Sequence, residues 1–309
     1  MGIGRGLLVR ESPSDGRSAI LSRQRDERCH HRVGPFQCFG RSWSIRTSDP
    51  ELSTHLDACY APMRSSDADD RSACFSVLTP DHGRGGVWRD DIEIAVSADP
   101  GTLVAQLFWA VNRHVIQPVQ DRVLLHAGAV ARGDAVVLLP AAMESGKTTL
   151  VAGLLDTGLA YLTDEAVALS ADGLVQGYRK PLSLDPGSWP VLPHHEPELP
   201  QRLKHYHRDQ WQVLATGFTD VVAEGYLRLL VFPEYVADQP VRLEPLSGAD
   251  ALRHASSCAF AVEETSSGIR ELRGLKNALT DVPAFRLSFG RLDEAVATVR
   301  RLMAAADDA

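Results

Sequence analysis

The chain has 309 residues, of which 44% are hydrophobic and 23% are charged, and its formal net charge is −8. This length and composition leave room for one large α/β domain and a smaller one, with a well-buried core. The acidic balance and the scattered Arg residues argue against a nucleic-acid surface, and no apolar run is long enough to span a bilayer.

The N-terminal residues carry no targeting pattern. Their apolar stretch is too short for a secretory signal, and Gly6 stands where a myristoylation motif has Ser or Thr. The five cysteines are irregularly spaced and odd in number, which is typical of reduced thiols. We therefore expect a cytoplasmic protein without a membrane partner. Residues 1–38 are rich in Arg, Ser, Gly and Asp and lack an apolar period, which predicts a flexible arm.

Residues 39–120 are predicted to form a small α+β layer. The expected elements are, in chain order, a strand from Phe39, a helix that begins at Ser48–Glu51, a strand over 74–79, turn-rich residues 81–86, a strand over 91–97 and a helix over 102–116.

Residues 121–309 are predicted to form the main domain. The expected elements are strands over 122–130 and 134–141 joined by a turn at Arg132–Asp134, a helix over 148–155, a strand over 159–169, a hairpin into 174–179, a strand over 226–233 and helices over 248–259 and 291–304. Together these elements indicate an α/β protein with a mixed sheet.

The strongest motif is A-A-M-E-S-G-K-T-T at 141–149, which follows an apolar strand and opens a helix. In that context successive backbone amides and the helix N-terminus form an anion site. Lys147 would reach the β- and γ-phosphates of a nucleotide, and the Thr148 hydroxyl would bind Mg²⁺. The predicted cofactor-binding residues of this loop are Ala142, Met143, Glu144, Ser145, Gly146, Lys147, Thr148 and Thr149.

The motif departs from the usual pattern at two places. Ala141 replaces the first glycine, which restricts the turn but leaves the amides and the lysine, and Glu144 brings a carboxylate close to the expected phosphates. The alternative interpretation is that Gly146 and Lys147 merely begin a helix after a turn.

Asp164 and Glu165 follow the apolar stretch of the next strand, where an open α/β sheet places ligand-binding groups. A carboxylate there can hold Mg²⁺, which we assign to Asp164, or accept the proton of an attacking hydroxyl. The residues leave open which of the two acids is the base. Solvated acids at a strand end are the alternative.

Three further side chains are candidates. His126 lies in the strand before the loop, where it would contact phosphates or orient a carboxylate, or fill the core. Arg179 and Lys180 follow the next hairpin and would stabilise a transferred phosphate, or lie on the surface. The Pro-rich segment 187–201 is either a lid over the site or a crossover loop. His194, His195, His205 and His207 are polar-loop residues to which no metal is assigned.

The run from Leu124 to Leu169, followed by YRKPLSL, resembles the catalytic domain of the HPr kinase/phosphorylase superfamily, and in particular the HPr kinase-related proteins of bacterial biosynthetic clusters. The resemblance rests on His126, the hairpin, the Gly146–Thr148 motif and the acidic pair. It implies a fold like that of phosphoenolpyruvate carboxykinase, ATP and Mg²⁺ as cofactors, and a homo-oligomer.

The resemblance implies an ATP-dependent kinase in which His126, Lys147, Asp164 and Glu165 are catalytic. The acceptor would be a peptide serine or a small hydroxylated metabolite, because the features that bind HPr itself are not recognisable. Ala141 and Glu165, which replaces a usual Asp, favour the alternative of a catalytically weak nucleotide sensor or scaffold. The sequence does not distinguish ATP from GTP or reveal a phosphorylase reaction.

Overall fold

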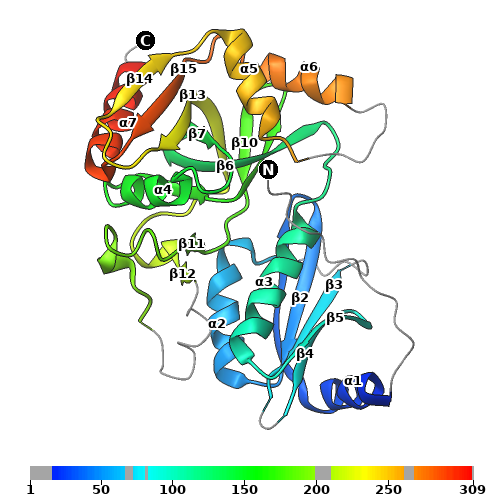
Figure 1. The fold of residues 1–309 in the computed structure, drawn as a ribbon. Helices are drawn as coiled ribbons and strands as arrows, with labels where there is room; N and C mark the ends of the chain where they lie inside the picture. Colours follow the sequence, from blue (N-terminus) through cyan, green and yellow to red (C-terminus); the bar gives the residue numbers. More distant parts are fainter. Residues whose placement is uncertain (1–15, 67–71, 81–82, 199–209, 261–267, 308–309) are drawn as a thin grey trace.

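The computed structural model describes residues 16–66, 72–80, 83–198, 210–260 and 268–307. They form two large sheets with helices packed on them and a small two-stranded sheet, which places the protein in the mixed α/β class (Figure 1). None of the helices in these ranges combines the length and apolarity that a membrane-spanning helix needs.

The first sheet has five strands in the order β1-β2-β3-β4-β5, with only β2 and β3 parallel. Helices α2 and α3 pack on it, and each begins where an aspartate side chain, Asp49 or Asp99, accepts hydrogen bonds from first-turn amides. The elements are α1 (Gly16–Arg28), β1 (His31–Cys38), β2 (Arg41–Thr47), α2 (Pro50–Tyr60), β3 (Ala73–Leu78), β4 (Gly85–Arg89), β5 (Ile92–Ser97) and α3 (Pro100–Val115).

The flexible arm predicted for residues 1–38 is wrong for residues 16–38, which form α1 and β1; residues 1–15 lie outside the described ranges. Only Val33, Phe36 and Cys38 of β1 are buried, and an irregularity between Val33 and Phe36 interrupts their alternation, so the strand has no clear apolar period. Helix α1 is fixed by Arg25, whose guanidinium donates to the Asp90 carbonyl and pairs with Asp91. The polar composition of this segment therefore gave no signal of helix α1, which the buried Arg25 attaches to the first sheet.

The second sheet has eight strands in the order β10-β9-β6-β7-β13-β15-β14, with β8 beside β6. Strand β10 also pairs with the start of β13, so part of the sheet closes on itself. A separate two-stranded ribbon is formed by β11 and β12. The strands are β6 (Arg122–Arg132), β7 (Ala135–Pro140), β8 (Ala160–Thr163), β9 (Ala166–Ser170), β10 (Leu174–Gly177), β11 (Leu182–Leu184), β12 (Trp211–Val213), β13 (Glu224–Tyr235), β14 (Arg242–Pro245) and β15 (Ala284–Phe289).

Helices cover both faces of this sheet: α4 (Lys147–Leu155) and α7 (Leu292–Asp307) one face, α5 (Gly248–Ser257) and α6 (Gly268–Ala278) the other (Figure 1). Strand β7 serves both layers by alternation, since Val137 and Leu139 join the core under α4 whereas Val136 and Leu138 join the other. Strands β7, β13 and β15 are parallel neighbours. Their carboxyl ends therefore share one edge, and the loop after β7 lies there.

The strand predicted over 159–169 is two strands, β8 and β9, which pair with successive halves of β6. The break falls at Asp164 and Glu165. There the Thr163 hydroxyl accepts hydrogen bonds from the amides of Glu165 and Ala166, which stabilises the turn. The turn predicted at 81–86 is likewise shorter, because β4 begins at Gly85.

Tyr178 connects the two sheets. It is fully buried, belongs to the core of the first sheet, and donates a hydrogen bond of 2.8 Å to the Asn112 side chain of α3. Its ring lies 6.4 Å from that of Phe39, and the nearby Cys38 thiol donates to the Gly177 carbonyl. The division at residue 120 stays a prediction, and one core crosses it.

We expect Tyr178→Ala to destabilise the whole chain by about 3 to 5 kcal/mol, as for other buried aromatic truncations. Urea unfolding measures this loss. The matched control is Tyr226→Ala, because Tyr226 is exposed on β13, and it should cost less than about 1 kcal/mol. Equal losses in the two variants would contradict the role given to Tyr178.

Candidate functional site

The 141–149 loop leaves the end of β7 and enters α4. Two of its residues, Glu144 and Gly146, have left-handed backbone conformations, with φ of +64° and +81°. Such turns aim successive amides inward and create an anion-binding concavity. Helix α4 has no side-chain cap at its N-terminus, so its first-turn amides are not occupied by a cap.

Gly146 is needed twice, for its positive φ and for its surroundings. A Cβ at this position would lie 3.0 Å from the Tyr235 Cβ and 3.1 Å from the Phe289 ring. The loop is also fixed to this edge of the sheet, because the Tyr235 amide donates to the Ser145 carbonyl. The parallel strands β13 and β15 thus hold the loop from behind.

Lys147 is 6% exposed and lies in the first turn of α4. Burial lowers the pKa of its ammonium, while the carboxylates of Asp164 and Glu165 oppose that shift. Gly128 on β6 makes room for the lysine stem, since a Cβ there would approach the Lys147 Cγ to 3.2 Å and Val151 to 2.6 Å. The fold therefore places one buried cation beside the loop.

His126 and Lys147 are in contact, with 3.2 Å between the lysine Nζ and the histidine Nε2. The histidine Nδ1 lies 2.9 Å from the Glu165 carbonyl. Only the neutral tautomer with a proton on Nδ1 satisfies both contacts. Burial, followed by the charge of Lys147, lowers the pKa of His126, which agrees with this tautomer.

Asp164 is buried and fully engaged. Its Oδ1 accepts hydrogen bonds from Tyr161 and from Lys180, both at 2.9 Å, and its Oδ2 accepts one from the Ser183 amide. Burial opposes ionisation, but the Lys180 charge and the Ser183 amide prevail and lower the pKa of Asp164. This carboxylate is held as an anion and oriented by three donors.

Glu165 is the less engaged acid of the pair. Its carboxylate is partly exposed and lies 3.8 Å from the Lys180 Nζ and 3.7 Å from the His126 Nδ1, both longer than hydrogen bonds. The two acids thus have different surroundings, although they are adjacent in the sequence. The positive charge of Lys147 interacts favourably with both carboxylates.

A pocket of about 390 Å³ opens over the loop, and Val191, Tyr235, Phe289 and Leu292 give it an apolar wall. The sequence did not single out three polar residues of this pocket, Ser183, Asp185 and Ser188. Ser183 lies within the quoted YRKPLSL run, Asp185 follows it, and Ser188 belongs to the Pro-rich segment. Ser188 is bonded to Thr149 at 2.6 Å. The described part of segment 187–201 therefore forms a wall of the pocket; its action as a lid stays a prediction.

The structure brings together most of the selected residues. The pocket is lined by Ala142, Glu144, Ser145, Gly146, Lys147, Thr148 and Thr149. His126, Asp164 and Glu165 are not among the described residues that line it, but His126 contacts Lys147 and the two acids interact with the lysine charge. Met143 is 83% exposed.

Arg179 and Lys180 are placed differently. Lys180 is buried in its ion pair with Asp164, and Arg179 borders a small cavity against Ala58 and Cys59 of α2. Among the described residues, neither lines the pocket over the loop. His205 and His207 lie outside the described ranges. The five cysteines are unpaired.

Comparison with known proteins gives a limited result. No family model matches the chain, and no curated protein matches it either. Among solved structures, the chain is similar to the HPr(Ser) kinase/phosphatase from Coxiella burnetii at 13% identity, over 59% of this chain and 98% of that one, with a TM-score of 0.29. This is a loose likeness, and the family predicted from the sequence stays a prediction.

The requirement for glycine at position 146 can be tested with a matched pair of alanine variants. Gly158 also has a positive φ, but nothing lies within 4 Å of its Cβ position. Gly158→Ala should therefore cost only the backbone strain, about 1 to 2 kcal/mol, whereas Gly146→Ala should cost about 1 kcal/mol more through overpacking. Chemical unfolding of both variants measures the difference, and equal costs would show that the crowding is relieved elsewhere.

The ion pair of Asp164 with Lys180 gives a pH-dependent prediction. Asp164→Asn removes the close anionic partner of the buried Lys180 and should cost about 3 to 5 kcal/mol at pH 7, more than the double change with Lys180→Met. Because the folded pKa of Asp164 is lowered, its contribution is complete above about pH 4, the unfolded value, and disappears as the pH falls through the folded pKa. Urea unfolding at pH 7 and pH 3 should show the gap between native protein and Asp164→Asn narrowing in acid; a constant gap would contradict the assignment.

Proposed function

We propose that the chain binds ATP with Mg²⁺ at the 141–149 loop and transfers the γ-phosphate to a hydroxyl group. The observation that carries the proposal is the position of Lys147. Its buried side chain lies in the first turn of α4, directly after a loop suited to anions, and its charge interacts with the carboxylates of Asp164 and Glu165. Phosphoryl transfer depends mainly on such positioning and electrostatics.

The residues of the loop fit a polyphosphate. The Ser145 hydroxyl is buried and has no hydrogen-bond partner among the described residues, which is a costly state for a polar group unless a ligand completes it. The first-turn amides of α4 and the Lys147 ammonium add donors for phosphate oxygens. The apolar wall of the pocket, including Val191 and Leu292, suits a nucleobase.

The Thr148 hydroxyl and a carboxylate would hold Mg²⁺, which when bound would neutralise charge on the phosphates. Asp164 was the carboxylate expected from the sequence, but it already accepts three hydrogen bonds. Asp185 lines the same pocket as Thr148, and we assign the second ligand to it. In this proposal Asp164 is a positioning residue that fixes Lys180 and the β11 start.

We assign the general base to Glu165. Its carboxylate accepts the proton of the acceptor hydroxyl, the hydroxyl oxygen forms a bond to the γ-phosphorus, and the bond from that phosphorus to the β,γ-bridging oxygen breaks, which releases ADP. Neutral His126 holds the Glu165 backbone through its carbonyl and contacts Lys147. The acceptor is a peptide serine or a small hydroxylated metabolite, the two classes left open by the sequence.

One observation favours a second function, a nucleotide-binding sensor or scaffold with weak catalysis. Of the two acids, one is fully engaged with Lys180 and Ser183 and the other contacts its neighbours only at 3.7 Å and 3.8 Å. A site without a well-oriented base binds a nucleotide but transfers its phosphate slowly.

Calorimetry with ATP and Mg²⁺ tests the proposal first. Lys147→Ala should weaken binding about 10- to 100-fold, because a charged hydrogen-bond donor is lost. Glu165→Gln should keep the affinity and lower transfer from labelled ATP to an acceptor library by about 10²- to 10⁴-fold. Ile269→Ala is the control that should change neither, since this side chain is exposed on α6, outside the loop and its pocket.

The possible results separate the two functions. Binding that depends on Lys147, without a product on any acceptor, would favour the sensor. No binding by the native protein would remove both functions, and binding that survives in Lys147→Ala would place the nucleotide elsewhere. Far-UV circular dichroism of each variant checks that it is folded.

A further inference from the structure

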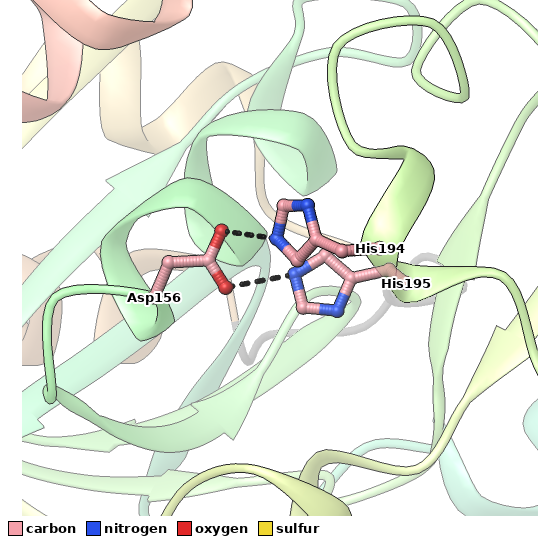
Figure 2. A group of neighbouring side chains, drawn as sticks. All are labelled: Asp156, His194 and His195. Carbon is pink, nitrogen blue, oxygen red and sulfur yellow. Dashed lines mark hydrogen bonds and ion pairs between the residues drawn. The ribbon is translucent and has the colours of Figure 1, made fainter.

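Three side chains with metal-binding atoms meet at the far end of α4 (Figure 2). Asp156 is the C-cap residue of the helix, and His194 and His195 come from a short 3-10 turn, Pro193–His195. The His194 Nε2 lies 2.9 Å from one carboxylate oxygen and the His195 Nε2 lies 2.9 Å from the other. One ligand atom from each residue lies within 4.8 Å of the others.

The contact of His195 with Asp156 is close but does not form a good hydrogen bond. The His195 side chain is 5% exposed and its Nε2 is buried. Although this nitrogen lies 2.9 Å from the Asp156 carboxylate, it has no hydrogen-bond partner among the described residues. A buried nitrogen without a hydrogen bond costs free energy. An ion bound between the His195 nitrogen and the Asp156 carboxylate would remove that cost.

The charges at the C-terminal end of α4 also favour the binding of a cation. Asp156 places a carboxylate at the C-terminus of the helix, where the macrodipole is negative. The Nε2 atoms of His194 and His195 each lie 2.9 Å from a carboxylate oxygen of Asp156, so a cation placed there would meet three ligand atoms at once.

We propose that Asp156, His194 and His195 form a binding site for a divalent transition-metal ion, of which Zn²⁺ is the best match. Two imidazoles and one carboxylate suit Zn²⁺ better than Mg²⁺ or Ca²⁺, which prefer oxygen ligands. Tetrahedral Zn²⁺ separates its ligand atoms by about 3.3 Å, so the pairs at 2.9 Å need to open only slightly. A pocket of about 480 Å³, lined by Asp156 and His194, gives access to a fourth position.

This site is distinct from the proposed Mg²⁺ position. Helix α4 has nine residues and is about 13 Å long, and the two sites lie at its opposite ends. The metal would fasten the segment that carries Ser188 to α4, and Ser188 contacts Thr149 in the loop. The proposal does not depend on the proposed function, because metal binding is measured on the protein without nucleotide.

Titration of the metal-free full chain with Co²⁺, followed by displacement with Zn²⁺, tests the site. The native protein should bind one Co²⁺ with visible d–d absorption of a four- or five-coordinate ion. His194→Ala and Asp156→Asn should each weaken binding by about tenfold or more, since even second-sphere changes cost 10- to 100-fold. The double variant His30→Ala/His31→Ala removes an exposed histidine pair elsewhere and should bind as the native protein does.

A thermal melt provides the second measurement. Zn²⁺ should raise the midpoint of the native protein and of the His30/His31 variant, but not that of His194→Ala, because only a metal bound to the folded state stabilises it. His194 is more than half exposed, so its removal should leave the fold intact. Equal Co²⁺ affinity in all variants, loss confined to the His30/His31 variant, or no binding by the native chain would each overturn the proposal.

Discussion

The buried ammonium of Lys147 is the constraint on which the candidate site depends. A charge in this environment is costly unless opposite charges or polar groups surround it. The fold meets that need with His126 on β6 and with the two carboxylates at the break between β8 and β9. Gly128 leaves space for the lysine stem against the sheet. The pairing of β6, the glycine at position 128 and the turn between β8 and β9 together create the environment of Lys147.

Lys147 and Lys180 lie near the acids Asp164 and Glu165, but the four side chains differ in how closely they are paired. Lys180 and Asp164 form a buried ion pair with further hydrogen bonds, whereas Lys147 has a neutral histidine as its direct partner and Glu165 has only long contacts. The first pair is a fixed part of the structure. Lys147 and Glu165, by contrast, can still form close charged hydrogen bonds. A phosphate ligand requires such a cation, and proton transfer requires such a carboxylate.

The sequence predicts the strand, loop and helix around Gly146 because their signals are local: an apolar run, a glycine and a helical pattern. It also predicts the neighbourhood of His126, since adjacent strands in a hairpin pair in a known register. It does not reveal that Lys180 turns inward to Asp164, because that depends on the path of β11. The sequence does not predict the roles of Asp185 or of the cluster at Asp156 for the same reason. Their partners come from distant segments, and residue spacing gives no signal of such contacts.

Helix α4 connects the two proposals through one property of its backbone. Its N-terminus has no side-chain cap, and its C-terminus ends on a carboxylate. The macrodipole favours an anion at the first end and a cation at the second, so a polyphosphate and a metal ion would each complete an end that the protein leaves unfavourable. The segment that reaches from Ser188 to His195 contacts both ends, through Thr149 and through Asp156. Occupation of either end would therefore order the same wall of the pocket, which makes α4 with this segment the element through which the two sites would be coupled.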